Sequence, residues 1–292
     1  MSTIADLPVG AKLKFGAYRV GDETPHKISW IKVHNDGTLL SEYIEDQCAF
    51  DAKEPDSFDE YRRMYGNNRY SLSNIHQFLN ATSYGWYEKA HECDEEPNDD
   101  GMTGNKFGYV HKPGFLHYFD SWELEAIDCY EIEARVPRDD VEYDTIERFP
   151  ARVFLPSKTN LFGSTEGGVY EGVQWDMFRW DDPPIASRFT HELYQDREWE
   201  DRPDNETDNF WYWLRTPQQE RGYGVRCVND EGGVSYDYAN EFYVGIRPAL
   251  KLNPETPVSD DPDEYGYYEV LEREIEIIEI TEEDFLAILK NE

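Results

Sequence analysis

Alternating apolar and polar positions near the start of the chain predict a β-hairpin. Apolar side chains recur at every second position through much of 12–20. After a turn-forming segment, residues 28–33 are expected to form the strand that pairs with it. A third short strand is expected at 37–43. These segments form the first sheet that the pattern indicates.

The clearest β signal lies between residues 210 and 252. Residues 210–214 are aromatic and apolar without a break, as in a strand buried on both faces. The runs 224–228 and 234–238 are expected to pair across a glycine-containing turn. A last strand is expected at 244–252, where Pro248 confines part of it to an edge or a bulge because proline has no N–H to donate.

Helical spacing is confined to two segments. Residues 70–79 place apolar side chains on one face behind a serine cap at Ser71 or Ser73, and 114–127 is expected to form a second helix packed on the first. His76 lies on the first helix, where we expect a hydrogen-bonded or exposed histidine rather than a metal ligand. A strand pair is expected at 131–141 and 143–149.

Two long segments, 83–108 and 175–209, lack periodicity and carry many aromatic residues. Aromatic side chains on loops above a rigid sheet are typical of recognition surfaces, although they can equally fold back as a small satellite core. Both interpretations stay open from the sequence. The candidate binding residues are Trp86, Tyr87, Trp175, Trp180 and Trp199.

Composition narrows the classes of partner. The net charge of −34 repels nucleic acids and anionic membranes, so neither is an expected partner, and no run of 18 apolar residues spans a bilayer. A solvated surface explains the acidity most simply; cation binding and a saline environment are the alternatives. The acidic run 94–100 could hold Ca²⁺, but it lacks the twelve-residue calcium-loop pattern, so no metal or cofactor is assigned.

Cysteine usage and the start of the chain indicate where the protein is made. The four cysteines are far apart with no C-x-x-C pair, which favours reduced thiols, and residues 1–10 lack the basic start and apolar run of a signal peptide. We therefore expect synthesis in a cytoplasm. An extracellular location would then follow from cell lysis or from incorporation into a virion.

Catalytic patterns do not rise above chance. No G-x-S-x-G motif occurs, and 62 acidic residues make any carboxylate pair uninformative. Cys227 is expected to be a small core residue rather than a redox centre. Arg215 and Arg247 lie within the buried β region, where arginine usually pairs with a carboxylate and ties strands together. The sequence therefore predicts no enzyme.

Several motifs resemble an uncharacterised domain family of bacteria and their phages. Residues 213–217 and 245–250 resemble its W-x-L-R-[ST]-P and G-[VI]-R-P-A-L motifs, which contain Trp213, Arg215, Gly245, Arg247 and Pro248. Residues 66–80 are similar to its N-R-Y-S-x-S-x-I-x-x-[WF]-L-N helix. Residues 153–163 are similar to its F-L-[PS]-S-x-x-E-x-x-G segment, with Asn160 in place of the glutamate. The resemblance covers about residues 7–255.

The resemblance implies an α+β, C-type-lectin-like fold, related to formylglycine-generating enzymes, with small twisted antiparallel sheets, two helices and long loops. In that family the opening strands form the sheet that the C-terminal strands rejoin. The expected domain spans 1–253, followed by an acidic extension at 254–292 in which 274–280 reads as a strand and 281–292 as a short helix. Such a pair needs a surface on the same chain or on a neighbouring one.

The expected function is that of a non-enzymatic phage virion protein, attached to a capsid or tail, that decorates the particle or binds a host receptor. Its partners would be other virion proteins or further copies of itself, together with a glycan or protein on the host surface. Two alternatives stay open: a bacterial carbohydrate- or protein-binding module, and an oxidoreductase of the formylglycine-generating type.

Overall fold

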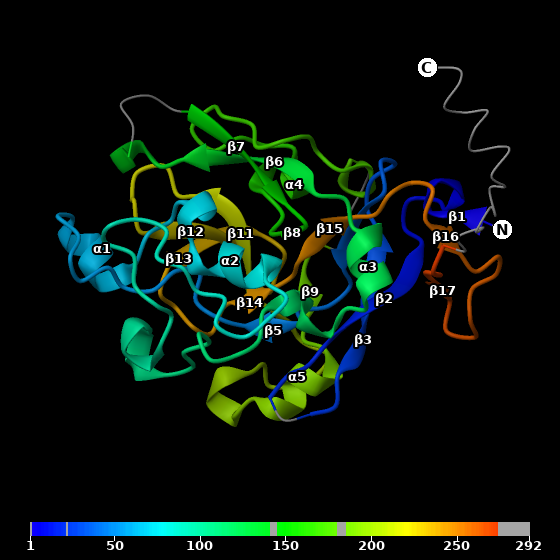
Figure 1. Cartoon of the computed structure of the whole chain (residues 1–292). Helices are drawn as coiled ribbons and strands as arrows, with labels where there is room; N and C mark the ends of the chain where they lie inside the picture. Colours follow the sequence, from blue (N-terminus) through cyan, green and yellow to red (C-terminus); the bar gives the residue numbers. More distant parts are fainter. Residues whose placement is uncertain (1, 22, 141–144, 180–184, 274–292) are drawn as a thin grey trace, which may run out of the picture.

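The two larger β-sheets each contain strands from the beginning and from the end of the sequence (Figure 1). The computed structural model describes residues 2–21, 23–140, 145–179 and 185–273. The six-stranded sheet has the order β17 (Tyr267–Glu269), β2 (Lys12–Tyr18), β3 (His26–Lys32), β4 (Thr38–Ser41), β15 (Ala249–Lys251) and β8 (Val153–Phe154). The five-stranded sheet has the order β13 (Val234–Tyr238), β12 (Gly224–Val228), β11 (Tyr212–Pro217), β14 (Gly245–Ile246) and β5 (Asp46–Gln47).

Three short strand pairs, five short α-helices and eight 3-10 turns complete the described secondary structure. The pairs are β1 (Ser2–Thr3) with β16 (Pro257–Val258), β9 (Ser187–Arg188) with β10 (Asn209–Phe210), and β6 (Tyr130–Val136) with β7 (Thr145–Ala151). The helices are α1 (Glu60–Tyr65), α2 (Asn74–Asn80), α3 (Ser121–Ala126), α4 (Lys158–Phe162) and α5 (His191–Asp196). Pairing is antiparallel except for β17 with β2 and β11 with β14. The predicted α+β class with small sheets is confirmed.

The chain crosses between the two sheets at Arg247-Pro248. β14 lies in one sheet and β15 in the other, so the strand expected at 244–252 is split. Pro248 cannot donate to a ladder, but its carbonyl accepts a hydrogen bond from Ser41 N at 2.9 Å. Arg247 donates to Ser41 O and Ile185 O, each at 2.9 Å. The G-I-R-P-A-L motif therefore joins the sheets.

Large aromatic side chains fill the core between these layers. Trp30 and Trp213 are fully buried, and each satisfies its indole N–H on a backbone carbonyl, Phe15 O at 2.7 Å and Cys48 O at 2.9 Å. A buried indole without such a partner would carry the full desolvation penalty of its N–H group. Trp30 thus ties β3 to its neighbour β2, and Trp213 joins segments 165 residues apart, while both fill space.

The second predicted helix is wrong as a continuous element. A 3-10 turn covers Phe115–Tyr118, and a separate α3 begins after Asp120. Asp120 has extended backbone and forms a capping box with Glu123, so the chain restarts a helix there instead of continuing one. The first predicted helix is likewise divided, into a 3-10 turn at Tyr70–Leu72 and α2, capped by Ser73.

The end of the chain returns to its beginning. β16 pairs with β1, and β17 pairs in parallel with β2. The strand pairing therefore continues beyond residue 253, where the sequence predicted a separate extension to begin. Val258 and Val270 are buried in the same core. The strand and helix expected at 274–292 lie outside the described residues. No helix in the described part of the chain has the length and apolar character needed to cross a bilayer.

Candidate functional site

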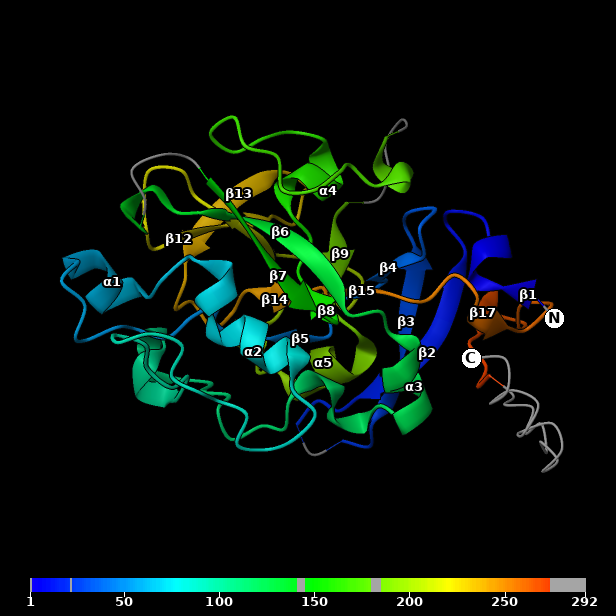
Figure 2. The same ribbon diagram turned by 45° about the horizontal axis from the view of Figure 1, so that its top comes forward.

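Helix α1 lies at one end of the molecule, far from the terminal strands in both ribbon views (Figures 1 and 2). Asp59 caps it by accepting hydrogen bonds from Tyr61 N at 2.7 Å and Arg62 N at 3.3 Å. Gly66, with φ 79°, ends it in a conformation that a side chain would strain. One short turn of helix therefore presents Tyr61 and Tyr65, four residues apart, on one face.

Four tyrosine rings form a continuous stack between α1 and the β12–β13 hairpin. Tyr61 stacks on Tyr223 at 4.9 Å between ring centroids, and Tyr65 lies 5.5 Å from Tyr223. Tyr65 also stacks on Tyr238 at 4.1 Å. Parallel packing of this kind adds specific attraction to the area it buries. The rings therefore hold one another in place without a ligand.

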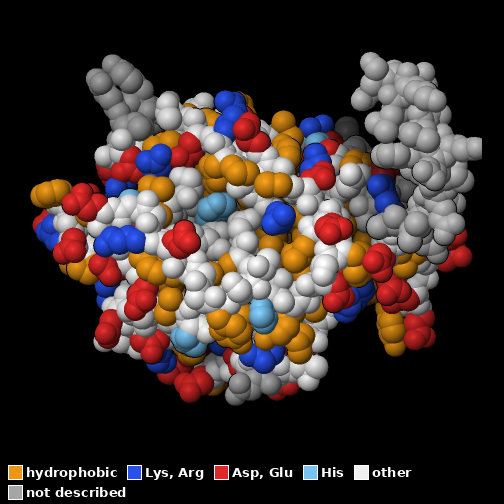
Figure 3. All heavy atoms as spheres, in the orientation of Figure 1, with side chains coloured by type: hydrophobic (Ala, Val, Ile, Leu, Met, Phe, Trp, Pro, Cys, Tyr) orange, Lys and Arg blue, Asp and Glu red, His pale blue; other side chains and the backbone are white. Residues whose placement is uncertain are grey.

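Exposed apolar side chains extend this stack. Phe58 is fully exposed, and Tyr61, Met64 and Tyr236 expose 46%, 48% and 37% of their surface. The space-filling view shows hydrophobic side chains projecting at the end where α1 lies (Figure 3). We call this group the tyrosine surface; its members are Phe58, Tyr61, Met64, Tyr65, Arg221, Tyr223, Tyr236 and Tyr238.

Arginines support the tyrosine surface from its edges. Arg221 lies 5.2 Å from the ring centre of Tyr236 and donates to its hydroxyl at 3.1 Å, and the tyrosines raise the pKa of this guanidinium. Arg62 donates to Gly222 O at 3.1 Å and pairs with Asp140 at 2.6 Å. These contacts fix the segment that carries Tyr223. The tyrosine surface therefore presents aromatic faces, phenol hydroxyls and a guanidinium held in fixed positions.

The sequence pattern missed the tyrosine surface. Tyr61 and Tyr65 show the i, i+4 spacing of a helix, and Tyr236 and Tyr238 alternate along a strand, so each half carried a signal. Their meeting depends on a contact between residues about 160 positions apart, as the Arg62 to Gly222 bond illustrates. Nothing local to either segment encodes that contact.

The structure separates the loop aromatics proposed as binding residues. Trp86 is 8% exposed, stacks on Tyr109 at 5.7 Å and donates to Lys112 O, and Trp175 is 4% exposed beside Phe178. These two belong to the core, so the satellite-core interpretation holds for them and a surface role is wrong. Tyr87 is half-buried, Trp199 is 70% exposed, and Trp180 lies outside the described residues. The four side chains that the structure describes do not form one surface.

The motif residues are structural, as expected, but the arginines bond mainly to carbonyl oxygens rather than to carboxylates. Arg215 donates to Glu133 O, Leu155 O, Glu171 O and Asn160 Oδ1 at 2.7–3.0 Å. Asn160, which stands where the resembling motif has glutamate, thus accepts a hydrogen bond from Arg215. Gly245 is required because a Cβ there would lie 2.4 Å from Ile44 Cγ2.

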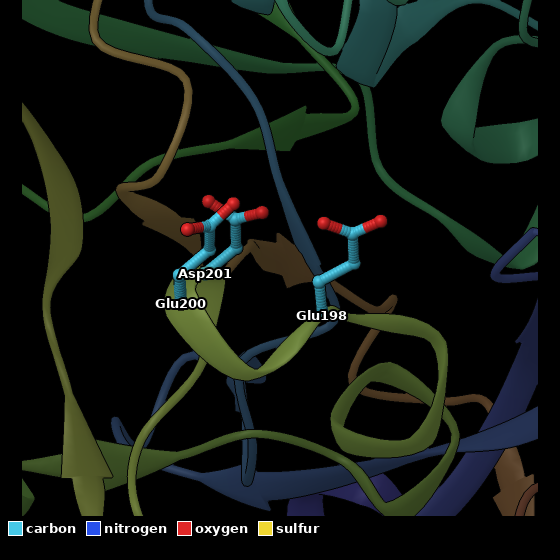
Figure 4. A group of neighbouring side chains, drawn as sticks. All are labelled: Glu198, Glu200 and Asp201. Atoms are coloured by element: carbon cyan, nitrogen blue, oxygen red, sulfur yellow. The ribbon is translucent and has the colours of Figure 1, made fainter.

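One group of carboxylates in the described residues is close enough to hold a cation: Glu198, Glu200 and Asp201 (Figure 4). A carboxylate oxygen from each of the three lies within 4.8 Å of the other two. Lys106 Nζ is 3.2 Å from Glu200 and 3.6 Å from Asp201. Lys106 thus pairs with two of the three carboxylates.

The other predicted chemical candidates are committed to structural contacts. In the acidic run 94–100, Asp94 accepts from Asn74 Nδ2 and Ala90 N, while Asp99 accepts from Gly108 N, so these side chains face separate amides. Burial against Tyr70 and Phe149 lowers the pKa of His76 to about 4. Cys48 and Cys227 are buried free thiols whose pKa burial raises strongly.

Comparison with known proteins identifies one family. The model of a domain of unknown function, DUF6273, matches residues 34–254, which is most of the chain. No curated protein matches the chain. No solved structure matches it either.

Proposed function

We propose that this chain, which belongs to the DUF6273 family, is a non-enzymatic recognition protein that binds a macromolecular partner through its tyrosine surface. The observation that carries the proposal is the preformed stack of Tyr61, Tyr223, Tyr65 and Tyr238 at the end of the molecule opposite the terminal strands. Tyrosine supplies large contact area at a low cost in conformational entropy. Rings that are already stacked lose little further freedom on binding.

The composition of the tyrosine surface supports a protein or glycan partner. Aromatic residues, methionine and arginine are enriched at interfaces, whereas acidic residues are depleted. The eight named side chains belong to the favoured types, and the exposed Asp56, Glu60 and Glu220 lie next to them in the sequence. Phe58 and Met64 leave apolar area in water that a partner would cover.

The buried thiols favour binding over oxidation chemistry. A reactive cysteine needs thiolate character and access, but Cys227 and Cys48 lie in the core and burial raises the pKa of both. This weighs against the formylglycine-generating type of oxidoreductase. Oxygen consumption that depends on thiols and disappears in Cys227→Ser would reverse that judgement.

We further propose a C-type-lectin-like fold displayed on a phage particle. Both sheets combine strands from before residue 50 with strands from after residue 210, which is the closure that the resemblance implies. The terminal strands lie together at the end opposite the tyrosine surface (Figure 1). Attachment near the termini would leave the tyrosine surface facing outward. A bacterial carbohydrate- or protein-binding module remains the alternative, with the same outward surface.

Particles purified from a culture that carries the gene test the proposal. We expect the chain to remain with the particles through a density gradient, as measured by mass spectrometry. The paired substitution Tyr61→Ser and Tyr223→Ser should leave the chain on the particle and reduce adsorption to host cells at least about tenfold. Tyr265→Ser is the matched control, because Tyr265 is 75% exposed and lies outside the tyrosine surface.

Two results would overturn this assignment in different ways. A chain found in the cell envelope and absent from particles would favour the bacterial binding module. Adsorption equal in the paired variant and the Tyr265→Ser control would remove the tyrosine surface from the recognition role.

A further inference from the structure

A second site lies apart from the tyrosine surface, beside β6. A cavity of 410 Å³ opens between the start of β6, the end of β7 and the segments that follow α4. Its lining includes Tyr130, Glu131, Glu133, Arg148, Asn160 and Arg215, which we call the β6 pocket. The volume is within the range of small-ligand pockets. None of its lining residues belongs to the tyrosine surface.

The floor of the β6 pocket is rigid because its polar groups are mutually bonded. Arg215 is 3% exposed and donates four hydrogen bonds, one of them to Asn160 Oδ1 at 2.8 Å. Asn160 Nδ2 in turn donates to Val173 O at 2.8 Å, and Glu133 accepts from Gly172 N at 3.1 Å. A preorganised floor spares a ligand the cost of ordering it.

The charges around the β6 pocket nearly cancel. Glu133 pairs with Arg148 at 2.6 Å, and Asp36 on the opposite rim pairs with Lys251 at 3.1 Å. His34, also in the lining, pairs with Asp176 at 2.7 Å. Glu131 is the lining carboxylate without an ion pair in the described part of the chain. An anionic ligand would have to compete with these paired carboxylates and would meet the charge of Glu131, whereas an uncharged ligand would not.

The rim offers donors and acceptors next to an aromatic ring. Glu131 and Glu133 accept hydrogen bonds, Arg148 donates, and the hydroxyl of Tyr130 does both. The Tyr130 ring is 42% exposed, with the Lys251 ammonium 4.8 Å from its centre. A ligand with several hydroxyl groups and an apolar C–H face can satisfy both kinds of contact.

We propose that the β6 pocket binds a neutral, polyhydroxylated ligand of monosaccharide size. A single hexose unit is small enough for the cavity, its hydroxyls both donate and accept, and it carries no charge. The ligand could be a free sugar or one unit of a glycan, and both present the same chemistry to the pocket.

Titration calorimetry of the full chain with glucose, galactose, mannose and N-acetylglucosamine tests the site. We expect at least one neutral sugar to bind with a Kd of about 1 mM, as is usual for a ligand of so few atoms. Tyr130→Ala and Glu131→Gln should each weaken that binding, Tyr130→Ala by about tenfold. Glucuronic acid should bind more weakly than the neutral sugars, because Glu131 repels it.

Matched controls separate this site from the tyrosine surface. Tyr265→Ala removes an exposed tyrosine outside both the pocket and the tyrosine surface and should leave sugar affinity unchanged. Tyr130→Ala should in turn leave adsorption of particles unchanged, so the two assignments can fail independently. Absence of heat with all four neutral sugars at tens of millimolar, tighter binding of a charged sugar, or equal loss in Tyr130→Ala and Tyr265→Ala would overturn the assignment.

Discussion

Arg215 illustrates how single residues hold this fold together. Its guanidinium is buried, and three of its four acceptors are backbone carbonyls contributed by β6, by the segment after β8 and by the loop after α4. Burial lowers the pKa of Arg215, opposed by the nearby Glu171 charge. Only the planar fork of arginine can reach all these acceptors at once.

Replacing Arg215 by lysine should therefore cost much stability despite conserved charge. Several carbonyls would lose their donor, and we expect the free energy of unfolding to fall by about 3 kcal/mol. Urea denaturation measures the change. Arg148→Lys is the control, because the Arg148 side chain is 58% exposed and its ion pair should contribute less than about 1 kcal/mol. Similar losses in the two variants would contradict this account.

Glu241 makes stability depend on pH near neutrality. Burial, with a contribution from Asp237, raises the pKa of Glu241 to about 7. A carboxyl with a raised folded pKa contributes stability that is complete below its ordinary pKa and is lost as pH rises through about 7. Glu241→Gln should remove this loss. Between pH 5 and 8 the free energy of unfolding of the native chain should therefore decrease by about 1–2 kcal/mol relative to that of the variant. Thermal unfolding across that pH range gives the difference, and parallel curves would refute it.

At the scale of elements, α1 carries two of the four stacked rings of the tyrosine surface although it has only six residues. Helices this short are marginal alone, so α1 depends on its cap and on contacts with the hairpin. Asp59→Ala removes two accepted hydrogen bonds and should cost about 1 kcal/mol. In this variant the rate of amide hydrogen exchange should rise at residues 60–65, while the exchange rates in β2 and β3 stay unchanged. Unchanged exchange in α1 would show that stacking alone holds the helix.

Local patterns predicted elements well where a strand alternates against one sheet. The expected strands at 12–20 and 28–33 are found as β2 and β3, and those at 224–228 and 234–238 as β12 and β13. The pattern failed where a single residue redirects the chain. Asp120 starts a new helix inside an apolar run, and Pro248 moves the chain between sheets. Trp86 and Trp175 were ambiguous because only tertiary packing decides whether a loop aromatic is buried.

At the scale of the whole molecule, the sheets are completed by the two ends of the chain. The predicted boundary at residue 253 can be tested against the observed pairing of β16 and β17. A chain ending at Asn253 loses both strands and uncovers Ile4 and Leu13, which are fully buried in the full structure. We expect its melting temperature to fall by several degrees relative to a chain ending at Arg273, which keeps both strands. Equal melting temperatures for the two chains would support a domain boundary at residue 253.

The parallel pairing of β17 with β2 also determines how the protein would carry mechanical load. A pull on the chain beyond Arg273 passes through residues 270–273, which bond to residues 255–258, and then reaches β17, where residues 267–269 are in register with residues 12–14 of β2. Tension along paired strands strains their ladder bonds together in shear instead of opening them one at a time. The force then enters the six-stranded sheet, at the end away from α1 (Figure 2). A tethered molecule could thus be stretched at its anchor while the stacked rings keep their geometry.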